Sequence, residues 1–274
     1  WEVKSEAAQR HDYKNLLSNR TIKIENNEWF KDCKLKDLEL LQQQTAYGFS
    51  AEDNDLILDS MASLAKEPTY CMGDDIPLAV LSSKPHILYD YFKQRFAQVT
   101  NPPIDPLREK LVMSLEMHLG ARCTPFEIKD PKPFIHLQSP ILNEEELISI
   151  KKSKIKSQTI SSLFDIEEGV QGLENQLKAI CKQSELSIKE GCSLIIISDK
   201  GINPKKTFIP PLLAVGAIHH YLLKKEIRLK ASLIIETGQC WSTHHLACLI
   251  GYGASAVCPW LTFEAGRHWL KHPK

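Results

Sequence analysis

Three short apolar runs in the C-terminal part of the chain place the strongest constraint on its fold. They are SLIIIS at residues 193–198, ASLIIE at 231–236 and ASAVCP at 254–259. Each run is apolar throughout rather than at every second residue, which is typical of parallel strands buried between two layers. A further strand is predicted at residues 159–164, and helical periodicity occupies residues 169–189, 211–224 and 242–251.

This alternation predicts an α/β fold with consecutive right-handed β/α units and a parallel sheet. About four strands are expected, whereas a closed (β/α)₈ barrel takes about 250 residues. We therefore expect a partial, half-barrel-like sheet at residues 158–260. A dinucleotide-binding fold is the weaker interpretation, because Gly201 and Gly238 near the strand ends do not form a GxGxxG pattern.

The preceding region, residues 37–125, predicts a helical part punctuated by proline. The first helix is expected to bury Leu38, Leu41, Thr45 and Phe49. Ser50 followed by Asp53 is typical of a helix N-cap and predicts a second helix that ends before Pro68. Its apolar side is expected to contain Leu56, Ile57, Ser60, Met61 and Leu64. A third helix is expected at residues 87–98.

Three prolines at positions 102, 103 and 106 predict a rigid, extended connector before a fourth helix. Proline has no N–H donor and restricts the residue before it. Asp105 is the expected N-cap of the fourth helix, and Pro106 is its expected first residue.

Other parts of the chain give weaker signals. Residues 134–137 predict a strand, and Asn143 followed by three glutamates predicts a capped helix. Residues 1–36 are polar, without a clear period, and are interpreted as a connector from a preceding domain. Because the sequence begins with Trp1 rather than Met, we expect a piece of a longer polypeptide.

Charge and hydropathy argue against two classes of protein. The 34 basic residues balance 34 acidic ones, so the chain lacks the net positive field of a nucleic-acid binder. No apolar run reaches the ~18–20 residues needed to span a bilayer. The first residues also lack the apolar stretch of a secretory signal. We expect neither a nucleic acid nor a membrane as a partner.

The eight cysteines are scattered and form no CxxC pair. This usage predicts buried free thiols and a reducing compartment rather than a disulfide scaffold. The spacing of Cys240, Cys248 and Cys258 matches no zinc or iron–sulfur pattern, so no metal site is expected. The histidine pairs at 219–220 and 244–245 lack an HExxH pattern and are interpreted as interface or core residues.

Polar residues follow the predicted strands where these end. They are Asp165, Asp199, Lys200 and Glu236, and we call the last three the strand-end rim. Carboxyl ends of parallel strands meet at one edge of a sheet, where functional groups gather. Two interpretations stay open: acid–base or phosphate chemistry at this rim, and ordinary capping of strand ends and helix starts.

Several long segments resemble the central domain of glutamate synthases. The most specific are CMGDDIPLAVLS at residues 71–82 and TNPPIDPLRE at 100–109, a pair that we know from no unrelated family. The similarity continues in GCSLIIISDKG at 191–201, IPPLLAVGAIHHYLL at 209–223 and the run at 232–264. Together these segments cover most of residues 38–264.

The resemblance implies a central domain at residues 37–264, followed by the start of a linker at 265–274. It implies a larger enzyme that makes L-glutamate from L-glutamine and 2-oxoglutarate. There, an amidotransferase domain releases ammonia from glutamine, and an adjacent domain with FMN and a 3Fe-4S cluster reduces 2-iminoglutarate. The electron donor would be ferredoxin or an NAD(P)H-oxidising subunit. This chain is expected to hold no cofactor and no complete active site.

The resemblance also implies a role in linking the two catalytic domains and in forming an internal ammonia route. From the rigidity of the proline-rich segment, we hypothesise that the contacts near this route are made by Thr100, Asn101, Asp105 and Arg108. A simple connector between two helices is the alternative for this segment. A stand-alone protein that binds a small anion at the strand-end rim is the alternative function. The expected location is the cytoplasm, or the plastid stroma in an alga or plant.

Overall fold

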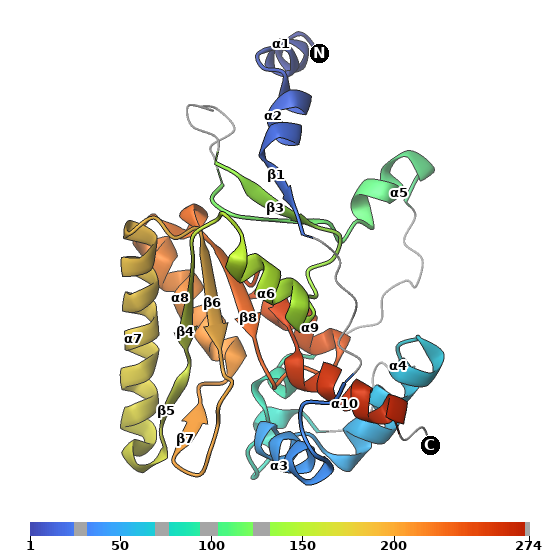
Figure 1. Ribbon diagram of the computed structural model, residues 1–274, viewed down its shortest axis with the longest axis vertical. Coiled ribbons are helices and arrows are strands. Elements are labelled where there is room, and N and C mark those ends of the chain that lie inside the picture. Colours follow the sequence, from blue (N-terminus) through green and yellow to red (C-terminus); the bar gives the residue numbers. More distant parts are fainter. Residues whose placement is uncertain (25–31, 69–76, 94–103, 123–131, 272–274) are drawn as a thin grey trace.

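The computed structural model describes residues 1–24, 32–68, 77–93, 104–122 and 132–271. Its C-terminal part is built around a four-stranded parallel sheet (Figure 1). The strands lie in the order β4 (Ser157–Ser161), β6 (Leu194–Ser198), β8 (Ser232–Glu236) and β9 (Ala256–Cys258). Every pairing between them is parallel, as the apolar runs predict. The connecting helices are α7 (Gly169–Lys189), α8 (Pro211–Lys224) and α9 (Thr243–Gly251).

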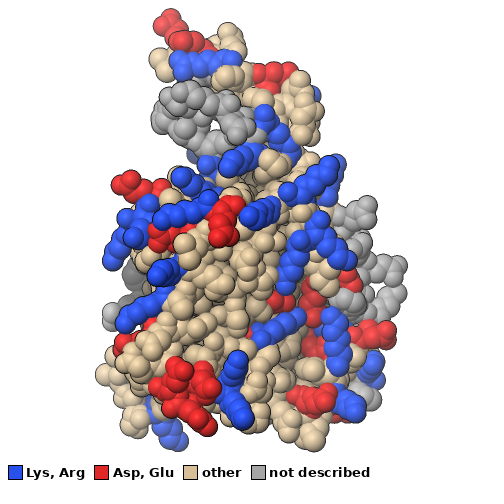
Figure 2. Space-filling model, turned by 60° about the vertical axis from the view of Figure 1, so that its left-hand side comes forward, with Lys and Arg blue, Asp and Glu red and all other residues tan. Residues whose placement is uncertain are grey.

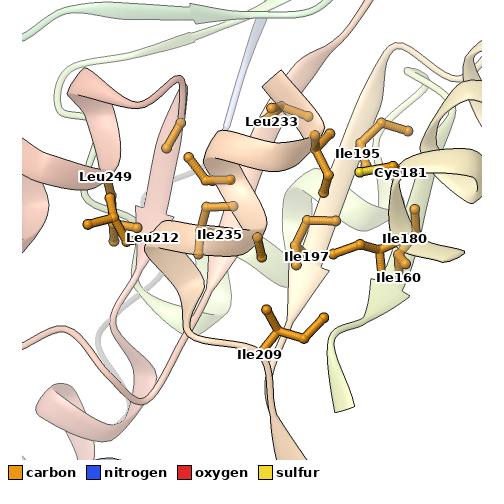
Figure 3. Packing of buried hydrophobic residues seen from close by; sticks show 14 of the residues in the cluster. Ile160, Ile180, Cys181, Ile195, Ile197, Ile209, Leu212, Leu233, Ile235 and Leu249 are labelled. Atoms are coloured by element: carbon orange, nitrogen blue, oxygen red, sulfur yellow. The ribbon is translucent and has the colours of Figure 1, made fainter. Parts of the chain in front are cut away.

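Both faces of the sheet are covered. On the outer face, side chains such as Ile195, Ile197 and Ile235 pack with residues of α7, α8 and α9 in one buried cluster (Figure 3). The alternate strand residues, such as Ile196 and Ile234, point to the inner face and belong to a second cluster. The inner cover comes from α3 (Asp37–Tyr47), α6 (Glu144–Lys152) and α10 (Trp260–Lys271).

The expected α/β fold with a partial parallel sheet is confirmed, and the described strands form no closed barrel. Residues 140–142 extend the sheet beyond β9. There the Leu142 amide donates to the Val257 carbonyl oxygen at 2.8 Å, and the Val257 amide donates to the Pro140 carbonyl oxygen at 2.8 Å. Helices occupy the inner face, where the remaining strands of a barrel would lie.

Two small sheets flank the parallel one. In the first, β3 (Phe134–Leu137) pairs in parallel with β1 (Thr21–Lys23) and antiparallel with β2 (Met117–Leu119). In the second, β5 (Leu163–Asp165) pairs antiparallel with β7 (Lys206–Phe208). The strand expected at residues 159–164 is therefore divided. Its second half leaves the parallel sheet after Ser162, whose amide donates to the Ser198 carbonyl oxygen at 2.9 Å.

The N-terminal part is largely helical. It comprises α1 (Glu2–Gln9), α2 (Tyr13–Arg20), α3, the π-helix η1 (Asp53–Leu58), α4 (Asp59–Leu64), the 3₁₀ turns η2 (Ala79–Leu81) and η3 (Leu88–Tyr91), and α5 (Pro106–Val112). Two further 3₁₀ turns lie in the C-terminal part, η4 (Ile166–Glu168) and η5 (Arg228–Lys230). Helices α1 and α2 extend away from the sheet (Figure 1).

The expected buried faces of the first two helices are partly wrong. In α3, Leu38 and Leu41 are exposed, and the buried residues are Leu40, Gln44 and Tyr47. The helix is turned this way because the Tyr47 hydroxyl reaches the interior and donates to the Asp199 carbonyl oxygen. On the second helix, Leu56 and Leu64 of the expected apolar side are also exposed.

The helix expected at residues 87–98 is wrong over its described part. Only the short turn η3 forms, and Phe92 after it is extended. The cause is Tyr89, which is fully buried and donates its hydroxyl to the Gln239 carbonyl oxygen at 3.0 Å. Residues 94–98 lie outside the described part of the chain.

The expected helix caps are confirmed. The Asp105 carboxylate accepts from the Arg108 amide at 3.0 Å, at the start of α5. Asn143 and Glu146 form a reciprocal capping box at the start of α6. Ser50 and Asp53 make the same kind of exchange. Among the described helices, none combines the length and apolar character that a membrane span requires.

Replacing Ile234 with alanine should lower the free energy of unfolding by about 3–4 kcal/mol. Ile234 is fully buried on the central strand β8, so the lost methyl groups leave a cavity in the inner cluster. Urea denaturation measures the change. The control is Leu229→Ala on the exposed turn η5, expected to stay within about 0.5 kcal/mol. Equal effects for the two variants would contradict the two-sided burial of the sheet.

Candidate functional site at the strand-end rim

The parallel strands β6 and β8 end side by side, because Ser198 pairs with Glu236 in their register. Asp199 and Lys200 follow the first strand, and Thr237 follows the second. The structure thus brings the three residues of the strand-end rim to one edge of the sheet. They divide into a buried carboxylate, Asp199, and an ion pair between Lys200 and Glu236.

The Asp199 carboxylate is only 2% exposed and lies at the centre of a hydrogen-bond cluster. It accepts from the Thr237 hydroxyl at 2.5 Å, the Gly238 amide at 3.0 Å and the indole N–H of Trp260 at 3.3 Å. The Tyr47 hydroxyl also lies 3.3 Å from this carboxylate. Asp199 therefore ties together the ends of β6 and β8, helix α3 and helix α10.

Burial sets the protonation behaviour of this cluster. It raises the pKa of Asp199 to about 6, although the donors from Thr237, Gly238 and Trp260 oppose the shift. Burial and the nearby Asp199 carboxylate raise the pKa of Tyr47, so its hydroxyl remains a donor. The described buried side-chain N and O atoms all have hydrogen-bond partners. The cluster is closed to solvent and presents no free acid or base to a substrate.

The second part of the rim is an ion-pair network. The Lys200 ammonium lies 3.1 Å from the Glu236 carboxylate, and Lys151 approaches the other Glu236 oxygen at 3.5 Å. Burial opposes ionisation of Glu236, but Lys200, the Ser198 hydroxyl and Lys151 outweigh it and hold the Glu236 pKa below its usual value. Burial favours the neutral Lys200 amine, but Glu236 and Glu144 raise the Lys200 pKa.

The network continues inward to helix α10. Glu144 lies 3.5 Å from Lys200 and 2.8 Å from the Arg267 guanidinium. Arg267 also binds Glu264 at 2.5 Å, and these three inner side chains are almost fully buried. The Glu264 carboxylate further accepts from the backbone amides of Lys34 and Leu35. The rim charges are thus paired across β6, β8, α6 and α10.

Asp165, the fourth strand-end residue, is placed elsewhere. It lies on β5, in the small antiparallel sheet opposite Lys206. Its carboxylate accepts from the Glu167 amide at 3.2 Å and caps the turn η4. These contacts lie on the small sheet and the turn η4, so capping is the role that the geometry of Asp165 supports.

The residues proposed for the ammonia route lie on a separate part of the molecule. Thr100 and Asn101 are outside the described residues. Asp105 and Arg108 form an ion pair at the start of α5, which stands away from the parallel sheet (Figure 1). Helix α5 exposes several large apolar side chains, among them Leu107, which is 94% exposed.

Sequence reasoning missed the residues that complete the rim. Tyr47, Trp260 and Glu144 contact it directly, and Arg267 joins it through Glu144. The sequence interpretation gave Glu144 only as an acid at a helix start. Arg267 fell within the expected linker at 265–274, but α10 continues to residue 271. A signal was present, since positions 260, 264 and 267 share one helix face.

The described residues contain one group with side chains close enough to suit a metal ion: Cys33, Glu264 and His268. One Glu264 oxygen already accepts from the Lys34 and Leu35 amides at 2.5 and 2.7 Å. The His268 Nε2 lies 2.8 Å from the Leu35 carbonyl oxygen and donates to it. Because these ligand atoms are engaged, the group fits a packing contact between segments rather than a metal site.

The cysteines likewise do not fit an iron–sulfur cluster within the described residues. Cys181, Cys192, Cys240 and Cys258 are buried free thiols on separate elements. Burial raises the pKa of Cys181 to about 11, so the thiol stays protonated. Cluster ligation uses thiolates grouped around the iron atoms, and these cysteines do not form such a group.

The histidine pairs have internal partners, in line with the interface or core interpretation. His219 accepts from the Arg228 guanidinium at 3.0 Å. His245 stacks on Tyr89, and burial lowers the pKa of His245 to about 3.

A groove of about 820 Å³ opens beside the start of α9, lined by residues that include His86, Phe92 and His244.

The sequence model of the glutamate synthase central domain matches residues 42–273. The ferredoxin-dependent glutamate synthase of Pyropia yezoensis is 48% identical over 279 residues, covering 100% of this chain and 18% of that relative. The chloroplastic enzyme of Oryza sativa subsp. japonica is 47% identical, covering 98% of this chain and 17% of that relative. The chain therefore spans less than a fifth of the length of these relatives.

Replacing Arg267 with alanine should lower the free energy of unfolding by about 3–5 kcal/mol. The change would leave the Glu144 and Glu264 carboxylates buried without their shared cation. Thermal or urea unfolding measures the loss. The matched control is Arg10→Ala, which removes an exposed pair with Glu6 and should change stability by less than about 1 kcal/mol. A loss no larger than that of the control would show that the ion pairs of Arg267 do not stabilise the fold.

The pH dependence of stability should identify the buried Asp199 carboxylate. Its folded pKa lies above its unfolded value, so the folded chain binds the proton more tightly and stability from this group is lost as pH rises from about 4 to 6. The Asp199→Asn variant does not titrate there. The stability of the unchanged protein relative to this variant should fall by about 2 kcal/mol between pH 4 and 7. A pH-independent difference in unfolding free energy would contradict the assignment.

Proposed function

The chain belongs to the glutamate synthase central-domain family, and we propose that it serves as the central domain of a ferredoxin-dependent glutamate synthase. The observation that carries the proposal is the 48% identity over the whole chain to the Pyropia yezoensis enzyme, of which it covers 18%. The relatives named above carry ferredoxin in their printed names. Those names favour ferredoxin over an NAD(P)H-oxidising subunit as the electron donor.

In this role the domain connects two catalytic domains. One domain hydrolyses glutamine to glutamate and ammonia. The other holds FMN and a 3Fe-4S cluster, which supply the electrons that reduce 2-iminoglutarate, formed from ammonia and 2-oxoglutarate. The paired charges of the strand-end rim support a structural contribution from this chain, because its carboxylates and ammonium groups are already engaged.

The exposed side of α5 supports contact with a neighbouring domain. Leu107 and Leu111 are 94% and 80% exposed, and Met113 just after the helix is 66% exposed. Clustered large apolar side chains on a surface mark interaction sites. We propose that this helix, with Asp105 and Arg108 at its start, lies against a catalytic domain near the ammonia route. Thr100 and Asn101 complete the proposed contact.

The alternative of a stand-alone anion-binding protein has less support. An anion site at the strand-end rim needs free positive charge or free amides. Lys200 and Lys151 are both paired with Glu236, and the Gly238 amide is bound to Asp199. The rim therefore offers little net attraction to an anion.

The printed names of the relatives also bear on location. The Oryza sativa and Arabidopsis thaliana enzymes are named chloroplastic, and a further relative comes from Synechocystis sp.. We propose the plastid stroma, or the cytoplasm in a bacterium, as the site of action.

In the whole enzyme, Arg108→Ala should loosen the coupling between the two reactions. Glutamine hydrolysis should then exceed 2-oxoglutarate consumption, because ammonia escapes to solvent where α5 no longer packs against the catalytic domain. The two rates are measured side by side in one assay, and Asn101→Ala should behave in the same way. Lys110→Ala on the same exposed helix is the control and should keep the rates matched. If Arg108→Ala and Asn101→Ala also keep them matched, the segment is only a connector.

A further inference from the structure

Exposed basic side chains gather at the end of the molecule where the parallel strands begin, opposite the strand-end rim. We call this surface the basic end, and its exposed members are Arg122, Lys152, Lys154, Lys156, Lys189, Lys224, Lys225 and Lys230. Figure 2 shows many Lys and Arg over the upper part of the sheet-bearing body, with a few acidic side chains among them, whereas basic and acidic side chains are mixed near the opposite end.

The fold brings these residues together from distant parts of the sequence. Strands β4, β6 and β8 are parallel and begin at the same edge, and α7 and α8 end just before β6 and β8. The amide of Ser193 donates to the Lys156 carbonyl oxygen at 3.0 Å, which joins the starts of β4 and β6. The Arg122 amide donates to the Leu229 carbonyl oxygen at 2.8 Å, which places Arg122 beside η5.

The charge at this end is unbalanced, although the chain as a whole has 34 basic and 34 acidic residues. Across residues 152–156, 189–190 and 224–230, the acidic side chains are Glu190 and Glu226. Lys189 is paired with Glu185 at 2.6 Å. Within the described structure, no hydrogen bond or ion pair engages the ammonium groups of Lys152, Lys154, Lys224 and Lys230.

Helix capping explains only part of this gathering. Cations favour the last turn of a helix, which accounts for Lys152, Lys189 and Lys224. Lys154 and Lys156 lie in the loop before β4, and Lys230 lies in η5 before β8. Like charges placed together repel, so the remaining basic residues point to a partner that supplies negative charge.

We propose that the basic end is the docking surface for an acidic electron-carrier protein of the ferredoxin type, an inference that rests on the proposed function. Opposite surface charges steer a small acidic protein to this face and make its association depend on ionic strength. A nucleic acid fits less well, because single-stranded sites interleave basic with aromatic side chains. The sequences KSKIK at 152–156 and KKEIRLK at 224–230 contain no aromatic residue.

The test uses the complete enzyme that carries this chain. The variant Lys154→Glu/Lys224→Glu reverses the charge of two side chains of the basic end without breaking a described contact. The control Lys14→Glu/Lys205→Glu makes the same net charge change on exposed residues of α2 and the loop before β7. The KM for reduced ferredoxin is measured at low and high ionic strength, together with glutamate formation driven by reduced methyl viologen.

At low ionic strength, the basic-end variant should show a KM for ferredoxin about fivefold or more above that of the control, with the gap closing at high salt. The rate with reduced methyl viologen should be equal in both. Equal KM values for ferredoxin would overturn the docking proposal. Failure of the unchanged enzyme to form glutamate with the artificial donor would instead contradict the proposed function.

Equilibrium binding of oxidised ferredoxin provides a second measurement that does not require turnover. If the basic-end variant loses activity with both donors, its dissociation constant for ferredoxin is compared with that of the control. Only a larger dissociation constant for the basic-end variant supports docking. Retention on immobilised DNA is measured in parallel. Loss of DNA retention with unchanged ferredoxin binding would assign the basic end to a nucleic acid and overturn the proposal.

Discussion

Two-sided burial of the parallel sheet is the constraint on which the rest of the structure depends. Strand residues such as Ile195 and Ile196 alternate between two faces, and both faces must be removed from water, at about 25 cal/mol per Å² of apolar surface. The helices α7, α8 and α9 cover the outer face, because each connects one parallel strand to the next. The inner face needs another source of apolar cover. Here α3, α6 and α10 supply it, so the N-terminal helical part shares a core with the sheet.

Covering the inner face with helices brings charged residues to the edge of the sheet, where each needs a partner. Buried carboxylates are costly unless cations and N–H donors engage them. Arg267 serves Glu144 on α6 and Glu264 on α10 together, while Asp199 collects donors from Tyr47 and Trp260. The same contacts that satisfy these charges hold the helical layers in register with the strands. The strand-end rim is therefore part of the structural frame.

The sequence patterns were informative where local physics decides the outcome. The bounds of α7 and α8, the strand β3 and the caps at Asp105 and Asn143 follow from periodicity and side-chain acceptors alone. The rotation of α3 could not be predicted, because it is set by a hydrogen bond from Tyr47 to a residue far along the chain. The rim partners were missed for a related reason. Periodicity places positions 260, 264 and 267 on one helix face, but it does not indicate the distant Asp199 and Glu144 that this face contacts.

The distribution of satisfied and unsatisfied charge then suggests how the domain works within a larger assembly. Active sites of parallel α/β folds usually lie at the carboxyl ends of the strands, yet in this chain that end is closed by internal pairing. Within the described residues, groups that remain available for contact lie elsewhere. They are the exposed apolar side chains on α5 and the unpaired ammonium groups at the basic end. These two surfaces differ in chemistry, so they suit different partners: a tightly packed neighbouring domain for α5, and a transient acidic protein for the basic end. A domain that uses its sheet for stability can therefore place its interactions on the outer surfaces without disturbing its core.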